Sequence, residues 1–170
     1  IQVMKARFLG LVVLAIFALS IAVMPALAHE GREVGEFLLE FGWRNEPALS
    51  GLFNGPEIFI EVHDAPEGTP FPEDIEVNLQ AEVTFGPETT TLPLRAAWGE
   101  TGHYIADLIP TMPGDYSFRV FGTIGDTEVN ETFSSSDGEF SSVEPSTDVM
   151  FPVAGITDTA ALQARIDDLE

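Results

Sequence analysis

Apolar and polar residues alternate along most of the chain between positions 34 and 133, in runs of strand length. In the stretch 115–124, for example, Tyr116, Phe118 and Val120 are separated by the single polar residues Ser117 and Arg119. A period of two residues is typical of strands with one buried face, and β-branched and aromatic residues favour the same conformation. The pattern predicts seven strands, over residues 34–43, 58–63, 75–85, 89–97, 102–109, 115–124 and 127–133.

Turn-forming residues separate these predicted strands. Clear examples are Asn54-Gly55-Pro56, Gly86-Pro87, Pro113-Gly114-Asp115 and Gly125-Asp126. Glycine and proline at such places supply the dihedral angles that tight turns require. Short strands joined by turns predict an all-β domain over residues 29–133, an immunoglobulin-like antiparallel β-sandwich of about seven strands. A small barrel is the alternative.

The first 28 residues follow a different pattern. Two basic residues precede the apolar run Phe8–Val23, and the small-residue sequence Ala26-Leu27-Ala28 follows it. This order is typical of a cleavable signal peptide, although the apolar run is also about long enough for a transmembrane anchor. We therefore predict a signal peptide with a helical centre over residues 4–28 and a mature chain beginning at His29. The protein is expected to be exported, to the periplasm or to the cell surface.

The alternation ends after the last predicted strand. Residues 134–156 are rich in Ser, Asp, Glu and Pro and are predicted to form an extended linker. Residues 157–170 begin with helix-capping residues, and Leu162 starts one heptad of coiled-coil spacing. A C-terminal helix is therefore predicted, with pairing of two copies of the chain as one role. The acids at its end oppose the helix dipole, so we also expect the native helix to continue past Glu170, where a membrane anchor is the other role.

The chain is strongly acidic, with a formal net charge of −21. Removal of residues 1–28 leaves five arginines, no lysine and 28 acidic residues, a net charge of −23. Such a surface repels phosphate backbones and anionic lipid head groups, which argues against nucleic acids as partners. The absence of cysteine excludes disulfides, thiol catalysis and cysteine-ligated zinc. Stability must therefore come from burial of the core.

One stretch carries a resemblance to a known kind of domain. Residues 102–124 read GHYIADLIPTMPGDYSFRVFGTI. They resemble the two late strands of many exported immunoglobulin-like modules, where G-x-Y is followed by P-G-x-Y-x-F. In those modules the residue corresponding to Tyr116 packs in the core, and its hydroxyl often fixes the preceding corner. Residues 29–152 as a whole resemble uncharacterised exported bacterial proteins that begin with His-Glu, and more distantly the periplasmic copper-binding CopC-like and YtkA-like sandwiches.

Copper is the metal that this resemblance suggests. After cleavage His29 carries a free α-amine beside its imidazole, and the two groups together chelate Cu(II) in the tetragonal geometry that this ion prefers. CopC-like proteins also begin with a histidine, but the Asp-x-His motif of their late strand is absent here. His103 and His63 are the other histidines of the chain and hence the candidate partners of His29. Alternatively, His29 is only the first residue of a frayed terminus.

Sequence motifs of enzymes are absent. The chain has no Gly-x-Ser-x-Gly, no phosphate-binding glycine-rich loop and no His-Glu-x-x-His. We therefore expect a non-catalytic binding or interaction module that requires no cofactor and binds an unidentified protein partner. The alternative is a copper-binding protein that uses His29. Because sandwiches host many functions, the fold does not decide between the two.

Overall fold

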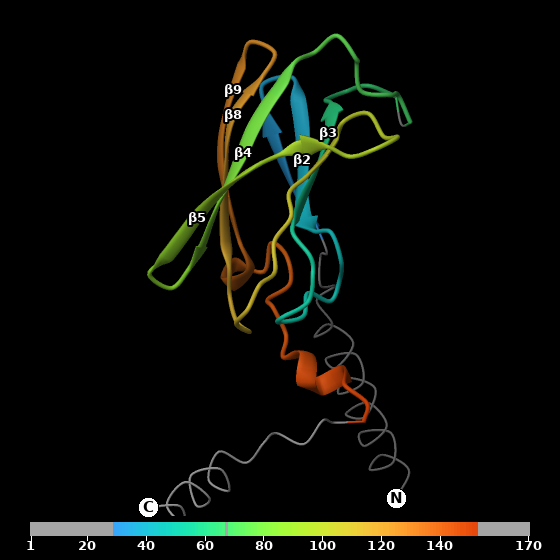
Figure 1. The fold of residues 1–170 in the computed structure, drawn as a ribbon. Coiled ribbons are helices and arrows are strands. Elements are labelled where there is room, and N and C mark those ends of the chain that lie inside the picture. Colours follow the sequence, from blue (N-terminus) through green and yellow to red (C-terminus); the bar gives the residue numbers. More distant parts are fainter. Residues whose placement is uncertain (1–28, 67, 153–170) are drawn as a thin grey trace, which may run out of the picture.

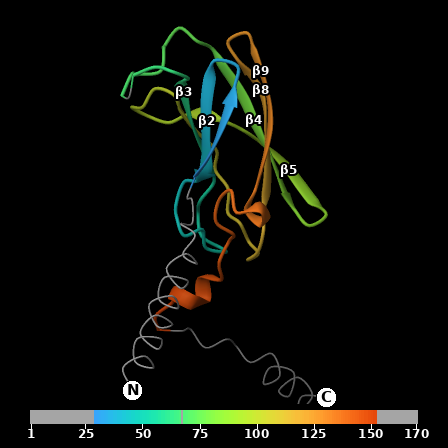
Figure 2. The same cartoon turned by 180° about the vertical axis from the view of Figure 1, so that it is seen from behind.

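The computed structural model describes residues 29–66 and 68–152, which form two antiparallel β-sheets packed face to face (Figure 1; Figure 2 gives the view from behind). The prediction of an all-β protein with two antiparallel sheets is confirmed. The predicted signal peptide over residues 4–28 and the predicted helix over residues 157–170 lie outside the described residues. Within the described part of the chain, no helix is long and apolar enough to cross a membrane.

The described residues contain nine strands. The larger sheet has the order β1-β2-β3-β7-β6, with β1 (His29–Val34), β2 (Phe37–Trp43), β3 (Pro56–Val62), β7 (His103–Ile105) and β6 (Arg95–Ala96). The smaller sheet has the order β5-β4-β8-β9, with β5 (Glu88–Pro93), β4 (Val77–Phe85), β8 (Ser117–Ile124) and β9 (Thr127–Ser134). Two short 3₁₀-helices follow, η1 (Ser135–Asp137) and η2 (Ser146–Val149).

The described part of the chain has nine strands where about seven were predicted, and the strand predicted over residues 102–109 is confined to His103–Ile105. Two further differences matter for the fold. Residues 29–34 form β1, which pairs with β2 around a turn that begins at Gly35. The single strand expected over residues 89–97 is divided between the sheets, because the Leu94 N–H still bonds the Leu79 carbonyl whereas Arg95 pairs with Ile105 of the other sheet. The chain thus crosses from one sheet to the other within two residues.

The core consists mainly of aromatic side chains that the alternation directs between the sheets. Phe41 stacks on Phe133 with ring centroids 4.6 Å apart, and Trp43 packs edge-on against Phe118 at 5.1 Å. Phe140 packs against three of these four rings. Aromatic pairs at such distances add to the stability that burial alone provides.

Part of the segment expected as a linker belongs to this core. Phe140 and Val143 are both 3% exposed, and the Trp43 indole N–H donates a hydrogen bond to the Ser141 carbonyl at 2.9 Å. Val143 also exchanges main-chain hydrogen bonds with Gly114. Two buried side chains and these hydrogen bonds therefore hold a polar segment against the sandwich.

Tyr116 fixes the corner before β8, as the resemblance implies. Its ring is buried, and its hydroxyl donates a hydrogen bond to the Met112 carbonyl at 3.0 Å. Burial raises the pKa of Tyr116, so the hydroxyl remains a donor at neutral pH. The bond ties the turn at residues 112–115 to the strand that follows.

Tyr116→Phe is expected to lower the free energy of unfolding by about 1 kcal/mol, the usual contribution of one buried hydrogen bond. Urea unfolding followed by circular dichroism measures the change. Tyr104→Phe is the matched control, because the described residues offer the Tyr104 hydroxyl no hydrogen-bond partner. Equal losses in the two variants would show that the corner bond contributes nothing.

The two sides of the sandwich are closed differently. Where β1 and β9 meet, the Arg32 guanidinium forms ion pairs with Glu131 at 3.6 Å and with Glu139, and it lies over the Phe133 ring. On the other side, β6 contains two residues only, and the chain after β7 faces β5 without a strand between them. One side is therefore sealed by side chains, and the other is open.

Candidate functional site

Two of the three histidines meet at one carboxylate on the outer face of the larger sheet. His29 Nε2 lies 3.1 Å from Glu57 Oε1, and His103 Nε2 lies 3.1 Å from Glu57 Oε2. His29 belongs to β1, Glu57 to β3 and His103 to β7. In the sequence, Glu57 is 28 positions from His29 and 46 positions from His103. We call these three residues the histidine–glutamate cluster.

The strand register explains how the imidazole of His29 reaches Glu57. In the register His29 pairs with Gly42 of β2, and Gly42 pairs with Glu57 of β3, so all three positions share one face of the sheet. Since Gly42 has no side chain, nothing of β2 stands between the imidazole and the carboxylate. His103 pairs with Phe59, the next residue of β3 on the same face.

Phe59 supports both imidazoles. The His103 ring stacks on the Phe59 ring with centroids 4.2 Å apart, and the His29 ring meets Phe59 edge-on at 6.0 Å. The stacking limits the rotation of the two imidazoles. The cluster is therefore partly pre-organised by packing as well as by hydrogen bonds.

Further carboxylates surround the cluster. Glu100 Oε2 lies 2.8 Å from the second ring nitrogen of His103, Nδ1. Glu46 lies close enough for the His29 charge to affect it. Burial raises the pKa of Glu46, while the Ser141 hydrogen bond and His29 lower it. The nearby charge of Glu57 raises it further. The site is thus negative overall and partly shielded from water, which favours a bound cation.

The side chains of the cluster form hydrogen-bonded pairs. Imidazole nitrogens and carboxylate oxygens are also metal ligands, but they bind zinc or copper at about 2 Å. Among residues 29–66 and 68–152, no three His, Asp or Glu side chains converge on one metal position. A metal here would need a donor from the main chain. The α-amine that cleavage before His29 would produce is such a donor, and the Nδ1 of the same residue lies within chelating reach of it.

Glu57 has a second role in this arrangement. A carboxylate that accepts from one ring nitrogen of a histidine fixes the tautomer and leaves the other nitrogen as a ligand. In a neutral His29 imidazole whose Nε2–H donates to Glu57, the ring lone pair lies on Nδ1, the nitrogen nearer the main chain.

His63 lies away from this cluster. It follows the other end of β3, where its side chain is 3.1 Å from Glu33 and 3.5 Å from Asp64. Six residues of extended chain separate it from Glu57, about 20 Å at the usual rise of a strand. Of the three candidate ligands, the structure brings together His29 and His103 and leaves His63 apart.

Sequence reasoning did not single out Glu57 or Phe59. The available signal was Phe59, an aromatic residue on the polar face of an alternating strand. Aromatic residues on an outward face often mark binding surfaces. Glu57 gave no signal, because the chain contains 28 acidic residues. No family model, curated protein or solved structure matches the chain.

Proposed function

We propose that this protein is a non-catalytic, immunoglobulin-like binding module of the exported kind, and that its ligand is Cu(II) held at His29. The observation that carries the proposal is the meeting of His29 and His103 at Glu57. In an exported protein that is cleaved after Ala28, this cluster acquires a free amine. The donor set then contains nitrogen and oxygen atoms, which suit the tetragonal geometry of Cu(II).

Each residue has a distinct part in the proposed site. The amine and Nδ1 of His29 chelate the ion, and Glu57 orients the imidazole through Nε2. His103 supplies a third nitrogen when its ring gives up the hydrogen bond to Glu57. The surrounding carboxylates contribute negative charge, which attracts a divalent cation and is weakened by added salt.

The protein that begins at His29 is expected to bind one Cu(II) ion, and acetylation of its amine is expected to weaken binding by about a hundredfold or more, because the chelate loses one of its two anchors. Glu57→Gln is expected to weaken binding about 10–100-fold, as removal of a ligand-orienting group usually does. Calorimetric titration gives the affinities, and electron paramagnetic resonance counts the nitrogen ligands.

His63→Ala and His103→Ala form the matched pair for this experiment. We expect His63→Ala to bind Cu(II) like the unchanged protein, whereas His103→Ala loses about tenfold and one nitrogen signal. Equal affinity of the acetylated and the unmodified protein would refute a site at the amine. Equal losses in the two histidine variants would refute the role of His103.

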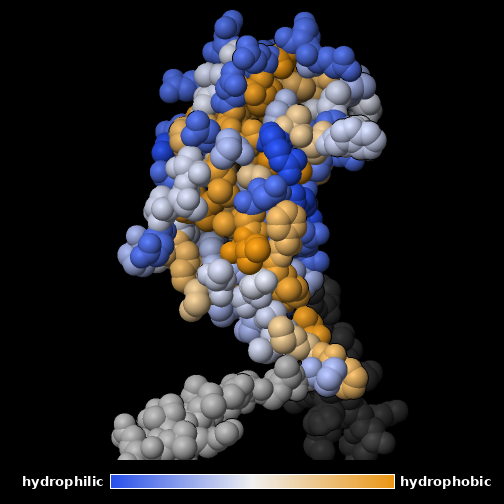
Figure 3. All heavy atoms as spheres, in the orientation of Figure 1, coloured by the Kyte–Doolittle hydropathy of each residue, from blue (hydrophilic) through white to orange (hydrophobic). Residues whose placement is uncertain are grey.

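Binding of a protein partner is a second candidate function, and a different part of the surface favours it. Large apolar side chains are exposed on the loops at one end of the sandwich, and in Figure 3 apolar residues form a band between polar residues on this face. They include Phe53, Ile109 and Met112, which are 50–59% exposed. We also keep the prediction that the chain is tethered to a membrane or that two copies pair through the helix expected at residues 157–170. Either arrangement would present this surface to a partner.

A further inference from the structure

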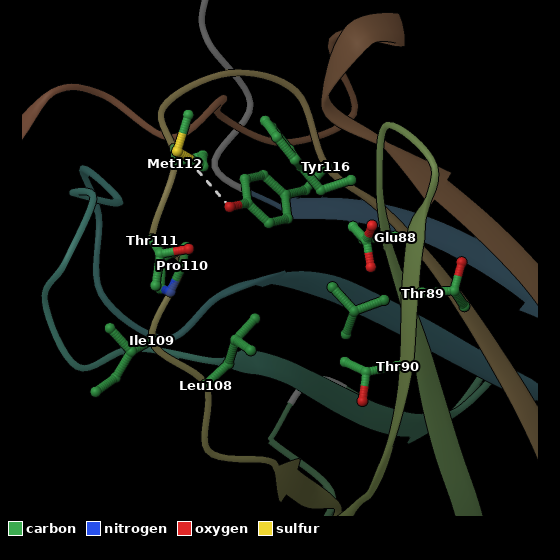
Figure 4. Close-up of a pocket in the computed structure, with 11 residues that line it drawn as sticks. Glu88, Thr89, Thr90, Leu108, Ile109, Pro110, Thr111, Met112 and Tyr116 are labelled. Atoms are coloured by element: carbon green, nitrogen blue, oxygen red, sulfur yellow. Dashed lines mark hydrogen bonds between the residues drawn. The ribbon is translucent and has the colours of Figure 1, made fainter.

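The open side of the sandwich contains a groove of about 320 Å³ between the β4–β5 hairpin and the chain after β7 (Figure 4). Its lining is mainly apolar and includes Val83, Phe85, Leu108, Met112 and Tyr116. Figure 4 shows Leu108 to Met112 along one wall and the strand of Glu88 to Thr90 along the other.

The first wall carries main-chain groups without partners. The N–H of Leu108 donates to the Asn54 carbonyl, and the carbonyl of Pro110 accepts from the Gly51 N–H. The main-chain groups of these even-numbered residues therefore point toward the loop between β2 and β3. The intervening residues Ile109 and Thr111 have no main-chain hydrogen bond within the described part of the chain. Alternating paired and unpaired groups are the pattern of a strand with one free edge.

The second wall presents side chains that belong to the inner face of a sheet. Thr90 pairs with Val83, which is buried, so the two side chains point to the same side. Thr90 is nevertheless exposed, and it lines the groove. The inner face of the hairpin is therefore left uncovered at this point.

The groove lies where the larger sheet lacks a strand. β6 is the edge strand of that sheet, and it pairs with β7 through only two residues, Arg95 and Ala96. A longer edge strand would pair with Ile109 and Thr111 and would cover Thr90. An extended peptide can do the same, because its main chain can form hydrogen bonds with the free sheet edge while its alternate side chains fill the groove.

We propose that this groove binds an extended segment of a partner protein as an added β-strand, with alternate apolar side chains and basic residues at its ends. Unpaired main-chain groups along one wall select a strand as the occupant. Charge complementarity selects the basic ends, because Glu88 lies at the groove and the chain has a net charge of −21. The inference deepens the second candidate function, and it is independent of Cu(II).

The test uses the chain of residues 29–170 in the presence of a chelator and the synthetic peptide Lys-Val-Thr-Val-Thr-Val-Lys as the probe. We expect saturable binding, and protection of the Ile109 and Thr111 amides from hydrogen exchange when the peptide is bound. The same peptide with proline at its central positions is expected not to bind, because it cannot pair with the edge. Glutamate in place of both lysines is expected to weaken binding about tenfold.

A matched pair of variants locates the site. Thr90→Arg places a long side chain in the groove, whereas Thr91→Arg places it on the opposite face of the same strand, beside Glu82. Both positions are exposed, so both variants should unfold at the same temperature as the unchanged protein. We expect Thr90→Arg to weaken peptide binding at least about tenfold and Thr91→Arg to leave it within about twofold.

Three results would overturn the proposal. The first is binding that both arginine variants weaken equally or that leaves the Ile109 and Thr111 amides unprotected. The second is binding only after deletion of residues 153–170, which would make the chain's own end the occupant. The third is self-association that Thr90→Arg abolishes, which would make a second copy the occupant. The interpretation of the peptide experiment does not depend on whether the protein binds Cu(II), because the chelator removes Cu(II) from the assay.

Discussion

Trp43→Ala is expected to lower the free energy of unfolding by about 4–5 kcal/mol, the upper part of the range for removal of a buried aromatic side chain. Trp43 is 1% exposed and packs edge-on against the rings of Tyr116, Phe118 and Phe140. Its removal leaves a cavity between the sheets, and the Ser141 carbonyl loses its indole donor. Since domains of this size are stable by about 5–15 kcal/mol, this single change brings the protein close to unfolding.

Trp98→Ala is the matched control, since Trp98 is 99% exposed and lies on the loop between β6 and β7. A surface substitution of this kind usually changes stability by less than about 0.5 kcal/mol. Urea unfolding followed by circular dichroism suits both variants, because each removes one of the two tryptophans and alters the fluorescence. A Trp43→Ala variant that unfolds at the same urea concentration as Trp98→Ala would contradict the central position of Trp43 in the core.

Gly122→Ala is expected to cost at least about 3 kcal/mol, because it combines backbone strain with a clash inside the smaller sheet. Gly122 lies in β8 with a φ of 134°, a region that residues with a side chain rarely adopt. A Cβ atom there would stand 2.0 Å from the Asn78 carbonyl oxygen. The carbonyl belongs to β4, which is paired on both sides and cannot move without breaking the sheet.

Gly31→Ala is the appropriate comparison, since Gly31 also lies in a strand. A Cβ atom at Gly31 would meet only the Leu38 side chain, at an ordinary 3.7 Å. We expect it to change the free energy of unfolding by less than about 1 kcal/mol. Thermal unfolding measures both variants, and a Gly122→Ala protein as stable as Gly31→Ala would show that β8 relaxes around the added methyl group.

The alternation of apolar residues predicted the central strands well, because burial of one face imposes a period of two. It failed to show where the chain changes sheets. Residues 89–97 keep the same alternation on both sides of Leu94, although β5 and β6 belong to different sheets. Periodicity describes which face is buried and carries no information about the neighbouring strand.

Composition was a weaker guide than periodicity. The segment after β9 looks like a linker because it is rich in serine and acidic residues, and yet Phe140 and Val143 lie in the core. They are only two residues, three positions apart in a polar segment, too few to establish the period of a helix or a strand. Such isolated apolar residues are recognised only when the cavity that they fill is known.

The histidine–glutamate cluster shows the same limit. His29 was a candidate from its position and chemistry, and His103 was one of two candidate partners. The choice between His103 and His63 depends on β7 pairing with β3, with Phe59 opposite His103. Strand order of this kind comes from the whole fold, and local sequence does not contain it.

The arginines carry a consequence for the conditions in which this protein is stable. All four arginines of the described residues are bonded to carboxylates: Arg32, Arg44, Arg95 and Arg119. These ion pairs neutralise the arginines locally. The acidic residues without an arginine partner repel one another across the surface. Dissolved ions screen such long-range repulsion, whereas they weaken a partly buried pair such as Arg32 with Glu139 much less. We therefore expect the fold to gain stability as ionic strength rises, so that concentrated brine favours it over fresh water.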